Sequence, residues 1–271
     1  MTSNPPTTLA ALLAALDVPR EGAVYVQSSL DWIQRAGFGA ADVLPALREW
    51  AGASGTLVMP SYPFHTSHLE YLESGASFDV RRTPSAIGLL PEMFRRTKGV
   101  VRSLDPDFCV AAIGPDAEAV VGRAPAEPDP FGPDSSYQRM IDGNATLLGL
   151  GVSLNTSSFI HAIDSRAQAG YPSAVYDDRR FTMNVTDTSG RTIAVQRQAL
   201  RPAFQRLTSP SAVGDVMAPA AEVFVTTDIN GARFFKWRLG PWAAWCLAHA
   251  GAQRATGAWP CWLSRLSGHV Q

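Results

Sequence analysis

The sequence predicts a single α/β domain with a central mixed β-sheet flanked by helices and an antiparallel hairpin in its C-terminal part. Three short apolar runs, 23–27, 56–60 and 145–152, are typical of strands that are buried on both faces of a sheet. Stretches with apolar residues at helical spacing lie between them. Residues 181–186 and 192–196 flank the short polar turn 187–190, which predicts the hairpin.

Length and composition describe a globular protein that can bury a large core. The chain has 271 residues, of which 46% are hydrophobic and 17% are charged. Because the formal net charge is only −1, neither a nucleic acid nor an anionic membrane is expected as a partner. The sequence contains no internal repeat or linker, so residues 1–271 are expected to form one domain, with 1–6 as a frayed polar tail.

The cysteines and the missing targeting signals predict a cytoplasmic protein without a metal site. Cys109, Cys246 and Cys261 have no metal-binding spacing and cannot all pair with one another, which fits a reducing compartment. The N-terminus lacks the basic start and apolar core of a signal peptide. No apolar run reaches the length of a membrane span.

The remaining elements follow from periodicity and from capping residues. A first helix is predicted over 9–16, after Thr7 or Thr8 as the cap and before Pro19. Further helices are predicted over 41–50, 86–96, 116–121, 137–141, 213–217 and 242–250, and further strands over 109–113, 221–227 and 232–239. Residues 62–85 are predicted to be a long loop, a kind of segment that often forms a lid or a substrate wall. Trp259 and Trp262 predict that the C-terminal tail packs against the body.

One strand end and one glycine turn are candidate ligand-binding positions. The first apolar run leads into Ser28-Ser29-Leu30, which brings hydroxyls and backbone N–H groups to the carboxyl end of the sheet, where α/β proteins bind ligands. Gly37-Phe38-Gly39 allows a tight turn into a helix N-terminus, a place that accepts phosphate. An ordinary strand–loop boundary explains the first pattern equally well, and no nucleotide-binding fingerprint surrounds the second.

His161 and Asp164 form the strongest catalytic candidate. Thr156-Ser157-Ser158 are good N-cap residues, and no helix breaker follows them until Gly170, so a helix is predicted to start there. Residues three apart on a helix share one face, so Asp164 can accept from one imidazole nitrogen of His161 and leave the other free to take a proton. In the first turn, the helix dipole also favours the neutral imidazole. The alternative is a half-buried histidine paired with a surface aspartate for structure alone.

Two other groups of polar residues are weaker candidates. His65 and His68 have the proximity of a metal pair, but no third ligand is near them, so a solvated loop is the preferred interpretation. Arg102 and Ser103 form a donor pair in front of a predicted strand. Without further context, a surface arginine before a buried strand with a core Cys109 is the stronger interpretation.

Seven short motifs stand in one order along the chain: Val26-Gln27-Ser28-Ser29-Leu30, Gly37-Phe38-Gly39, Gly55-Thr56-Leu57-Val58-Met59-Pro60-Ser61, Arg102-Ser103, Phe131-Gly132, Leu147-Leu148-Gly149 and His161-x-x-Asp164. This order resembles the aminoglycoside N3-acetyltransferase family of the antibiotic N-acetyltransferase superfamily, which is distinct from the GNAT fold. The resemblance covers residues 20–170 well and the C-terminal third loosely. Each motif alone is weak, whereas seven in register are specific.

The resemblance implies a single-domain α/β enzyme that uses acetyl-CoA to acylate a primary amine and needs no metal. The family's His-x-x-Glu falls on His161 and Asp164. The resemblance places along the CoA groove Ser28, Ser29, Leu30, Gly37, Phe38, Arg102 and Ser103, with Phe131, Gly132 and Ser135 at its pantetheine end.

The chain departs from the family pattern at several positions. Asp105-Pro106 stands where the family usually has His-Pro, Cys109 where it has Ser, and Asp164 where it has the longer Glu. The Asp105-Pro106 version resembles members tied to amino-sugar or natural-product biosynthesis. A polycationic aminoglycoside would be steered by carboxylates, and this chain is nearly neutral. The expected acceptor is therefore an amine of an amino sugar or of a natural-product intermediate.

The expected mechanism is direct acyl transfer with His161 as general base and Asp164 orienting it. Backbone N–H groups near Ser28 and Ser29, or the hydroxyl of Ser103, are candidate donors to the oxyanion. A Ser-His-Asp hydrolase is a second hypothesis, although the chain has no Gly-x-Ser-x-Gly motif. A catalytically silent binding or scaffold protein is a third. The length of the acyl group and a homodimeric assembly are left open.

Overall fold

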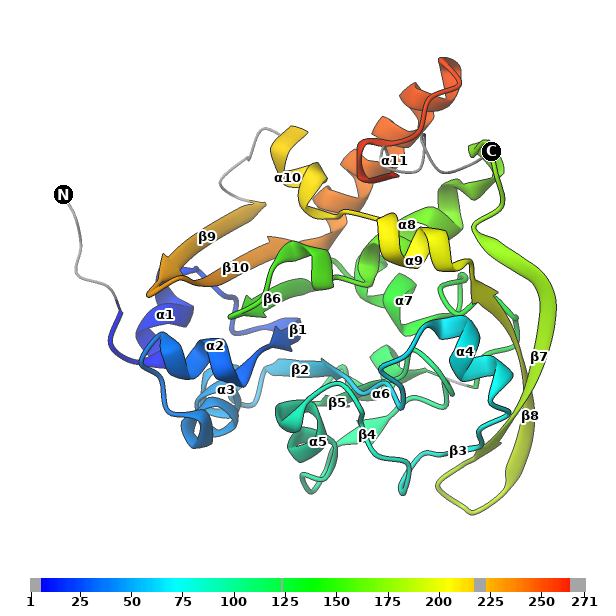
Figure 1. Ribbon diagram of the computed structural model, residues 1–271. Coiled ribbons are helices and arrows are strands. Elements are labelled where there is room, and N and C mark those ends of the chain that lie inside the picture. Colours follow the sequence, from blue (N-terminus) through cyan, green and yellow to red (C-terminus); the bar gives the residue numbers. More distant parts are fainter. Residues whose placement is uncertain (1–5, 123, 217–222, 264–271) are drawn as a thin grey trace.

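The computed structural model describes residues 6–122, 124–216 and 223–263 of the chain (Figure 1). Its main sheet has seven strands in the order β4-β5-β2-β1-β6-β10-β9. The three central strands, β1 (Gly22–Ser28), β2 (Gly55–Pro60) and β6 (Thr146–Leu150), run parallel. The outer strands are antiparallel to their neighbours: β4 (Val101–Arg102), β5 (Val110–Ile113), β9 (Phe224–Ile229) and β10 (Ala232–Arg238). The predicted mixed sheet is confirmed.

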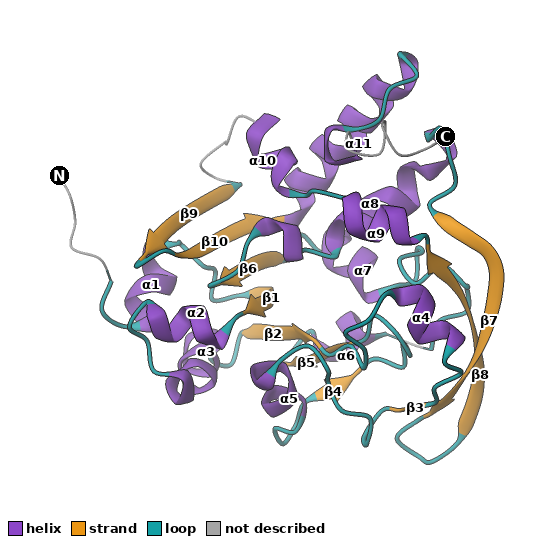
Figure 2. Ribbon diagram, viewed as in Figure 1, coloured by secondary structure: helices purple, strands orange, loops and turns teal. Residues whose placement is uncertain are grey.

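A second, smaller sheet holds the predicted hairpin (Figure 2). Its strands are β7 (Tyr176–Thr186) and β8 (Thr192–Leu200), which are antiparallel, and β3 (Phe78–Asp79), which pairs with β7 in parallel. The hairpin is confirmed, and both of its strands are longer than the predicted 181–186 and 192–196. The predicted strands were too short because polar residues at the outer positions hide the alternation on which a strand prediction depends.

Helices cover both faces of the main sheet, so that β1 is buried on both sides. Val24 and Val26 of β1 belong to one apolar core, whereas Tyr25 belongs to the other. The first core contains side chains of α1 (Leu9–Ala15), α2 (Leu30–Arg35), α3 (Val43–Ala51) and α5 (Leu89–Arg95). The second contains side chains of α6 (Ala117–Val121), α7 (Ser136–Asp142), α8 (Phe159–Ala167), α9 (Pro202–Leu207) and α11 (Leu239–Ala255). This two-sided burial explains the uninterrupted apolar runs in the sequence.

The loop predicted over 62–85 was wrong in part. It contains α4 (His68–Glu73) and the short strand β3. Helix α4 begins with a capping box, in which Ser67 Oγ accepts from the Glu70 N–H at 3.3 Å and Glu70 Oε2 accepts from the Ser67 N–H at 2.9 Å. The spacing Ser-x-x-Glu was visible in the sequence and is a start signal for a helix.

The other predicted elements are present with shifted ends. The helix expected over 86–96 begins only at Leu89, and the final helix extends to Ala255. Helix α10 (Ser211–Val216) and strand β9 correspond to the predicted 213–217 and 221–227, whose residues 217–222 lie outside the described part. The predicted tail 1–6 also falls outside it except for Pro6. No helix of the described residues is long and apolar enough to cross a bilayer.

Candidate active site

His161 lies in the first turn of α8, directly beyond the carboxyl end of β6. Strand β6 ends at Leu150, and Gly151 and the 3-10 turn η2 (Leu154–Thr156) connect it to α8. The residue is only 8% exposed. Its Nδ1 lies 3.5 Å from Oδ2 of Asp164, and both atoms are buried without another hydrogen-bond partner. Nε2 is not among the buried unpaired atoms and makes no hydrogen bond within the described residues. The ring therefore presents Nδ1 to Asp164 and keeps Nε2 available.

Asp164 is fully buried and is held by two donors on one oxygen. The hydroxyl of Tyr171 donates to Oδ1 at 2.8 Å, and the indole Nε1 of Trp262 donates to the same atom at 2.9 Å. Asp164 was expected as a surface residue if the pair were only structural, and it is instead completely enclosed. Burial and the neighbouring Asp164 carboxylate raise the pKa of Tyr171, so its hydroxyl stays protonated and donates.

Phe131 forms the aromatic wall beside the imidazole. Its ring centroid is 5.5 Å from that of His161, and its ring is fully buried between Phe108 at 4.6 Å and Tyr137 at 4.9 Å. Gly132 follows it and accepts a backbone hydrogen bond from Ser135. The hydroxyl of Ser135 accepts from the Gln138 N–H at 3.2 Å and so caps α7. Of the predicted group, Phe131 packs against the ring of His161, whereas Gly132 and Ser135 line a separate small pocket.

The end of β1 lies next to the segment that leads into α8. Ser28 pairs with Leu150 in the sheet, and the Ser29 N–H donates to the Leu150 carbonyl at 2.9 Å. The side-chain amide of Gln27 donates to the Thr156 carbonyl at 2.6 Å. These bonds join the first predicted ligand position to the loop before His161, because β1 and β6 are parallel neighbours and end at the same edge.

A pocket of about 590 Å³ opens at this strand end. It lies between α2 and the start of α5, and it is lined by Ser28, Ser29, Leu30, Asp31, Gln34, Ala40, Ile87, Gly88, Leu89, Leu90 and Pro91. Leu89 is 63% exposed, an unusual exposure for a large apolar side chain. The three predicted residues 28–30 therefore share one pocket with an apolar wall.

Gly37 and Phe38 lie at the other end of α2 and line a different pocket. That pocket has a volume of about 340 Å³ and also contains residues of α1. Phe38 is buried and packs edge-on against Phe234, with ring centroids 5.8 Å apart. Gly37 has φ +99°, a conformation that favours glycine. The structure does not bring these two residues into the pocket of Ser28.

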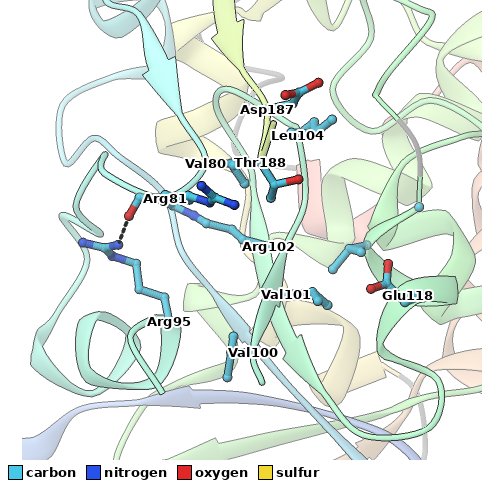
Figure 3. A pocket seen from close by; sticks show the side chains of 12 residues that line it. Val80, Arg81, Arg95, Val100, Val101, Arg102, Leu104, Glu118, Asp187 and Thr188 are labelled. Atoms are coloured by element: carbon cyan, nitrogen blue, oxygen red, sulfur yellow. Dashed lines mark hydrogen bonds between the residues drawn. The ribbon is translucent and has the colours of Figure 1, made fainter. Parts of the chain in front are cut away.

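Arg102 and Ser103 lie at the edge strand β4, four places from β6 in the sheet order. The guanidinium of Arg102 donates to the carbonyls of Thr83 and Ser61. The hydroxyl of Ser103 accepts from the Val110 N–H at 3.0 Å, and Ser103 makes no hydrogen bond to His161 within the described residues. Figure 3 shows the pocket of about 410 Å³ that Arg102 lines together with Arg81. The Arg-Ser pair is thus largely engaged by the protein itself.

Three tyrosines form a hydroxyl cluster at the start of α8, and no sequence pattern predicted it. Tyr25 OH lies 3.3 Å from Tyr62 OH and 3.1 Å from Tyr137 OH, and Tyr62 also contacts Tyr137. Tyr62 donates to Ser158 Oγ at 3.0 Å, at the N-cap of α8. Burial raises the pKa of all three hydroxyls, so they stay neutral and fix the position of the helix start.

His68 belongs to a buried ionic network, so the prediction of a solvated loop was wrong. Its Nε2 lies 3.0 Å from Asp107 Oδ2, and its Nδ1 accepts from the Leu200 N–H at 3.0 Å. The guanidinium of Arg197 in β8 donates to Asp107 at 3.1 Å and to Asp105. Arg197 is shared by both carboxylates, and a buried charge needs such an opposite partner. Among the described residues, no group of three His, Cys, Asp or Glu side chains is arranged to hold a metal ion.

The fold and the site together define an α/β protein with a paired histidine and aspartate beyond the carboxyl edge of a mixed sheet. The sequence profile of the aminoglycoside 3-N-acetyltransferase family matches residues 25–233, so the chain belongs to that family. The resemblance drawn from the motifs is confirmed.

Curated relatives support the same assignment, and a solved structure shares the fold. The chain is 30% identical over 170 residues to "Aminoglycoside N(3)-acetyltransferase VIII" from Streptomyces fradiae, over 58% of this chain and 59% of that protein. It is 32% identical over 164 residues to "Aminoglycoside N(3)-acetyltransferase IV" from Salmonella sp, over 59% of each. The match thus spans about three fifths of the length of these curated relatives. The solved structure of AAC-IIIb in binary complex with CoASH has the same fold, with a TM-score of 0.72 at 21% identity, over 91% of this chain and 95% of that chain.

Proposed function

We propose that this chain transfers the acetyl group of acetyl-CoA directly to a primary amine of an amino sugar, with His161 as the general base. The observation that carries the proposal is the orientation of the imidazole, whose Nδ1 faces the buried Asp164 carboxylate while Nε2 has no hydrogen-bond partner among the described residues. The names of the relatives make aminoglycosides the first acceptors to test. Amines of natural-product intermediates belong to the same chemical class.

His161 and Asp164 act as one unit in this proposal. As the amine nitrogen bonds to the acyl carbon, it loses a proton to Nε2 of His161, and the C–S bond of the thioester breaks. The CoA thiolate that leaves takes the proton from the imidazolium and departs as the thiol. While the ring carries the proton, Asp164 stabilises the imidazolium through Nδ1, because the two opposite charges lie close together in a buried place. The Nδ1–Oδ2 separation of 3.5 Å is long for a hydrogen bond, and it is expected to shorten when the ring becomes charged.

The pocket beside Ser28 fits the pantetheine arm of the co-substrate. When bound, acetyl-CoA supplies the activated acyl group. The hydroxyls of Ser28 and Ser29 can bond to amide groups of pantetheine, and the wall formed by Leu30, Leu89 and Pro91 can cover its methylenes. Gln27 Oε1 and Ser157 Oγ, near the same strand end, are buried without partners and can accept or donate to a ligand.

The two alternative functions have less support. A Ser-His-Asp hydrolase needs a serine hydroxyl that is hydrogen-bonded to the imidazole. Within the described residues, no serine side chain makes a hydrogen bond to His161. A silent scaffold protein does not require a buried carboxylate beside His161, and burying one is costly even with the two donors that bind Asp164.

Replacing His161 by Ala is expected to lower kcat by roughly 10²–10⁴-fold while acetyl-CoA still binds, because the ring acts on a proton and does not line the pocket proposed for pantetheine. Thiol release measures turnover, with amino sugars, nucleotide amino sugars and aminoglycosides as acceptors. Thermal unfolding with acetyl-CoA measures binding. The exposed His65, replaced by Ala, is the matched control and should retain full activity.

Three outcomes would contradict the proposal. Retained turnover in the His161→Ala variant would show that another group is the base. Loss of CoA binding together with turnover would assign His161 a structural role. Steady thiol release without any added amine would favour the hydrolase.

A further inference from the structure

We propose that Tyr171 and Trp262 are positioning residues that aim the Asp164 carboxylate at His161, so that the segment 259–263 is part of the catalytic apparatus. The inference rests on the proposed function, because it assigns these two side chains a role in the reaction of His161. Neither residue was expected at the site from the sequence, in which Trp262 predicted only that the tail packs.

The geometry of the carboxylate carries the inference. Both donors bind the same oxygen: Tyr171 OH lies 2.8 Å and Trp262 Nε1 lies 2.9 Å from Oδ1. The other oxygen, Oδ2, is the one that faces Nδ1 of His161, and it has no other partner. Two donors on Oδ1 fix the rotation of the carboxylate and leave Oδ2 free for the imidazole.

Because Asp164 is buried, the orientation of its carboxylate depends on its protein donors. Asp164 and Trp262 have no measurable exposure, so water cannot replace the indole donor, whereas Tyr171 is half-buried. Hydrogen bonds to a charged acceptor are stronger than neutral ones, and a buried carboxylate without donors is costly. A carboxylate that lost one of these donors would turn toward the remaining partners, and Oδ2 would lose its alignment with Nδ1.

Trp262 is itself held in place by other segments. Its carbonyl accepts from the Ser209 N–H at 2.8 Å, and the neighbouring Cys261 N–H donates to His249 Nε2 of α11 at 3.2 Å. Ser211, beside Ser209, donates through N and Oγ to Asn155 Oδ1 at 2.9 and 2.8 Å. Asn155 lies in η2, immediately before α8. The tail is therefore tied to the same segment that positions His161.

The test uses Trp262→Phe and Tyr171→Phe, which remove the donors and keep most of the packing. Each change is expected to lower kcat by roughly 10- to 100-fold, because misplacement of a catalytic group by less than 1 Å has effects of this size. The KM values for acetyl-CoA and the amine should stay within about twofold, since neither side chain contacts the proposed pocket.

A double-mutant cycle with Asp164→Asn separates positioning from structure. Asparagine keeps an oxygen for the two donors but no carboxylate for His161, so any structural contribution of Trp262 persists while its catalytic contribution disappears. In the Asp164→Asn background, Trp262→Phe should therefore change kcat by less than about twofold. The matched control is Trp242→Phe, because Trp242 is equally buried and its Nε1 has no partner. It should retain wild-type kcat.

Two results would overturn the inference. The first is wild-type kcat in both Tyr171→Phe and Trp262→Phe, and the second is an equal fold-loss of kcat from Trp262→Phe in the wild-type and Asp164→Asn backgrounds. Near-ultraviolet circular dichroism checks folding, and Tyr171→Phe serves alone where Trp262→Phe does not fold. If His161→Ala and Asp164→Asn lose activity while Tyr171→Phe and Trp262→Phe keep it, only this inference fails. If His161→Ala retains activity, the proposed function fails instead.

Discussion

At the scale of single residues, Arg197 is shared by two carboxylates where the two sheets meet. It lies on β8 of the small sheet, whereas Asp105 and Asp107 lie between β4 and β5 of the main sheet. Burial alone would raise the pKa of Asp107, yet Arg197 and His68 hold it at about 2. Burial raises the pKa of Asp105 to about 6, because Arg197 only partly offsets it and Asp107 adds repulsion. One guanidinium thus satisfies Asp107 better than Asp105.

The stability of the protein is expected to depend on pH through Asp105. Its folded pKa of about 6 lies above its ordinary value of 3.8, so between these values the native state holds a proton that the unfolded state has released. Stability therefore falls as pH rises through this window, by about 2–3 kcal/mol for a shift of this size. Asp105→Asn removes this slope. Urea unfolding at pH 4 and pH 7 measures the free energy of unfolding of both proteins.

Asp107→Asn provides the contrast. The folded pKa of Asp107 lies below its ordinary value, so its contribution is present above about pH 4 and is lost as pH falls through about 2. This variant should be destabilised at neutral pH, unlike Asp105→Asn. A wild-type difference from Asp105→Asn that is the same at pH 4 and pH 7 would contradict the assignment.

At the scale of elements, the junction between β6 and α2 sets the position of the loop before His161. Gly151 has φ +70°, and a Cβ placed on it would lie 2.7 Å from Cβ of Trp32 and 3.1 Å from the carbonyl oxygen of Ser29. Its N–H donates to the Arg233 carbonyl of β10 at 2.8 Å. Only glycine allows the chain to turn here while α2 approaches this closely.

Gly151→Ala is therefore expected to destabilise the fold by about 2–4 kcal/mol, from backbone strain plus displacement of α2. Gly257→Ala is the matched control, because Gly257 also has φ +70° but nothing lies within 4 Å of its Cβ position. That control should cost only about 1–2 kcal/mol. Urea unfolding measures both, and equal losses would show that α2 yields without cost.

At the scale of the whole molecule, the site lies where three parts of the chain converge. The central parallel strands end at one edge, α8 starts beyond that edge, and α11 packs against α8 (Figure 1). The pocket of Ser28 and the His161–Asp164 pair are therefore anchored in different cores, one on each face of the sheet. A ligand that spans both would link α2 and α5 to the region of α8.

Binding of acetyl-CoA is thus expected to stabilise the entire fold. At a concentration of 100 times Kd, the gain in free energy of unfolding is about 2.7 kcal/mol if only the native state binds. Thermal unfolding should show this gain for the wild type and for His161→Ala alike. ATP, which lacks the pantetheine arm, is the control ligand. A larger shift with ATP than with acetyl-CoA would count against the pocket assignment.

Features that depend on residues close together in the chain could be predicted from the sequence, whereas those that depend on distant residues could not. The spacing of His161 and Asp164 is a local property of one helix, so their shared face was predictable. The paired donors on Asp164 were not, because Trp262 lies 98 residues away in the chain. His68 was misassigned for the same reason, since its partner Asp107 is 39 residues distant and nothing near His68 indicates burial.

The sequence by itself determined the fold class, the mixed sheet, the C-terminal hairpin, the family and the histidine–aspartate spacing. These features depend on periodicity, on motif order and on contacts between residues a few positions apart. Only the tertiary structure decided that Asp164 is clamped by Tyr171 and Trp262, and that Ser28 and Gly37 line separate pockets. The physical reason is that hydrogen bonds and cavities between distant segments depend on packing in three dimensions, which leaves no periodic signal along the chain.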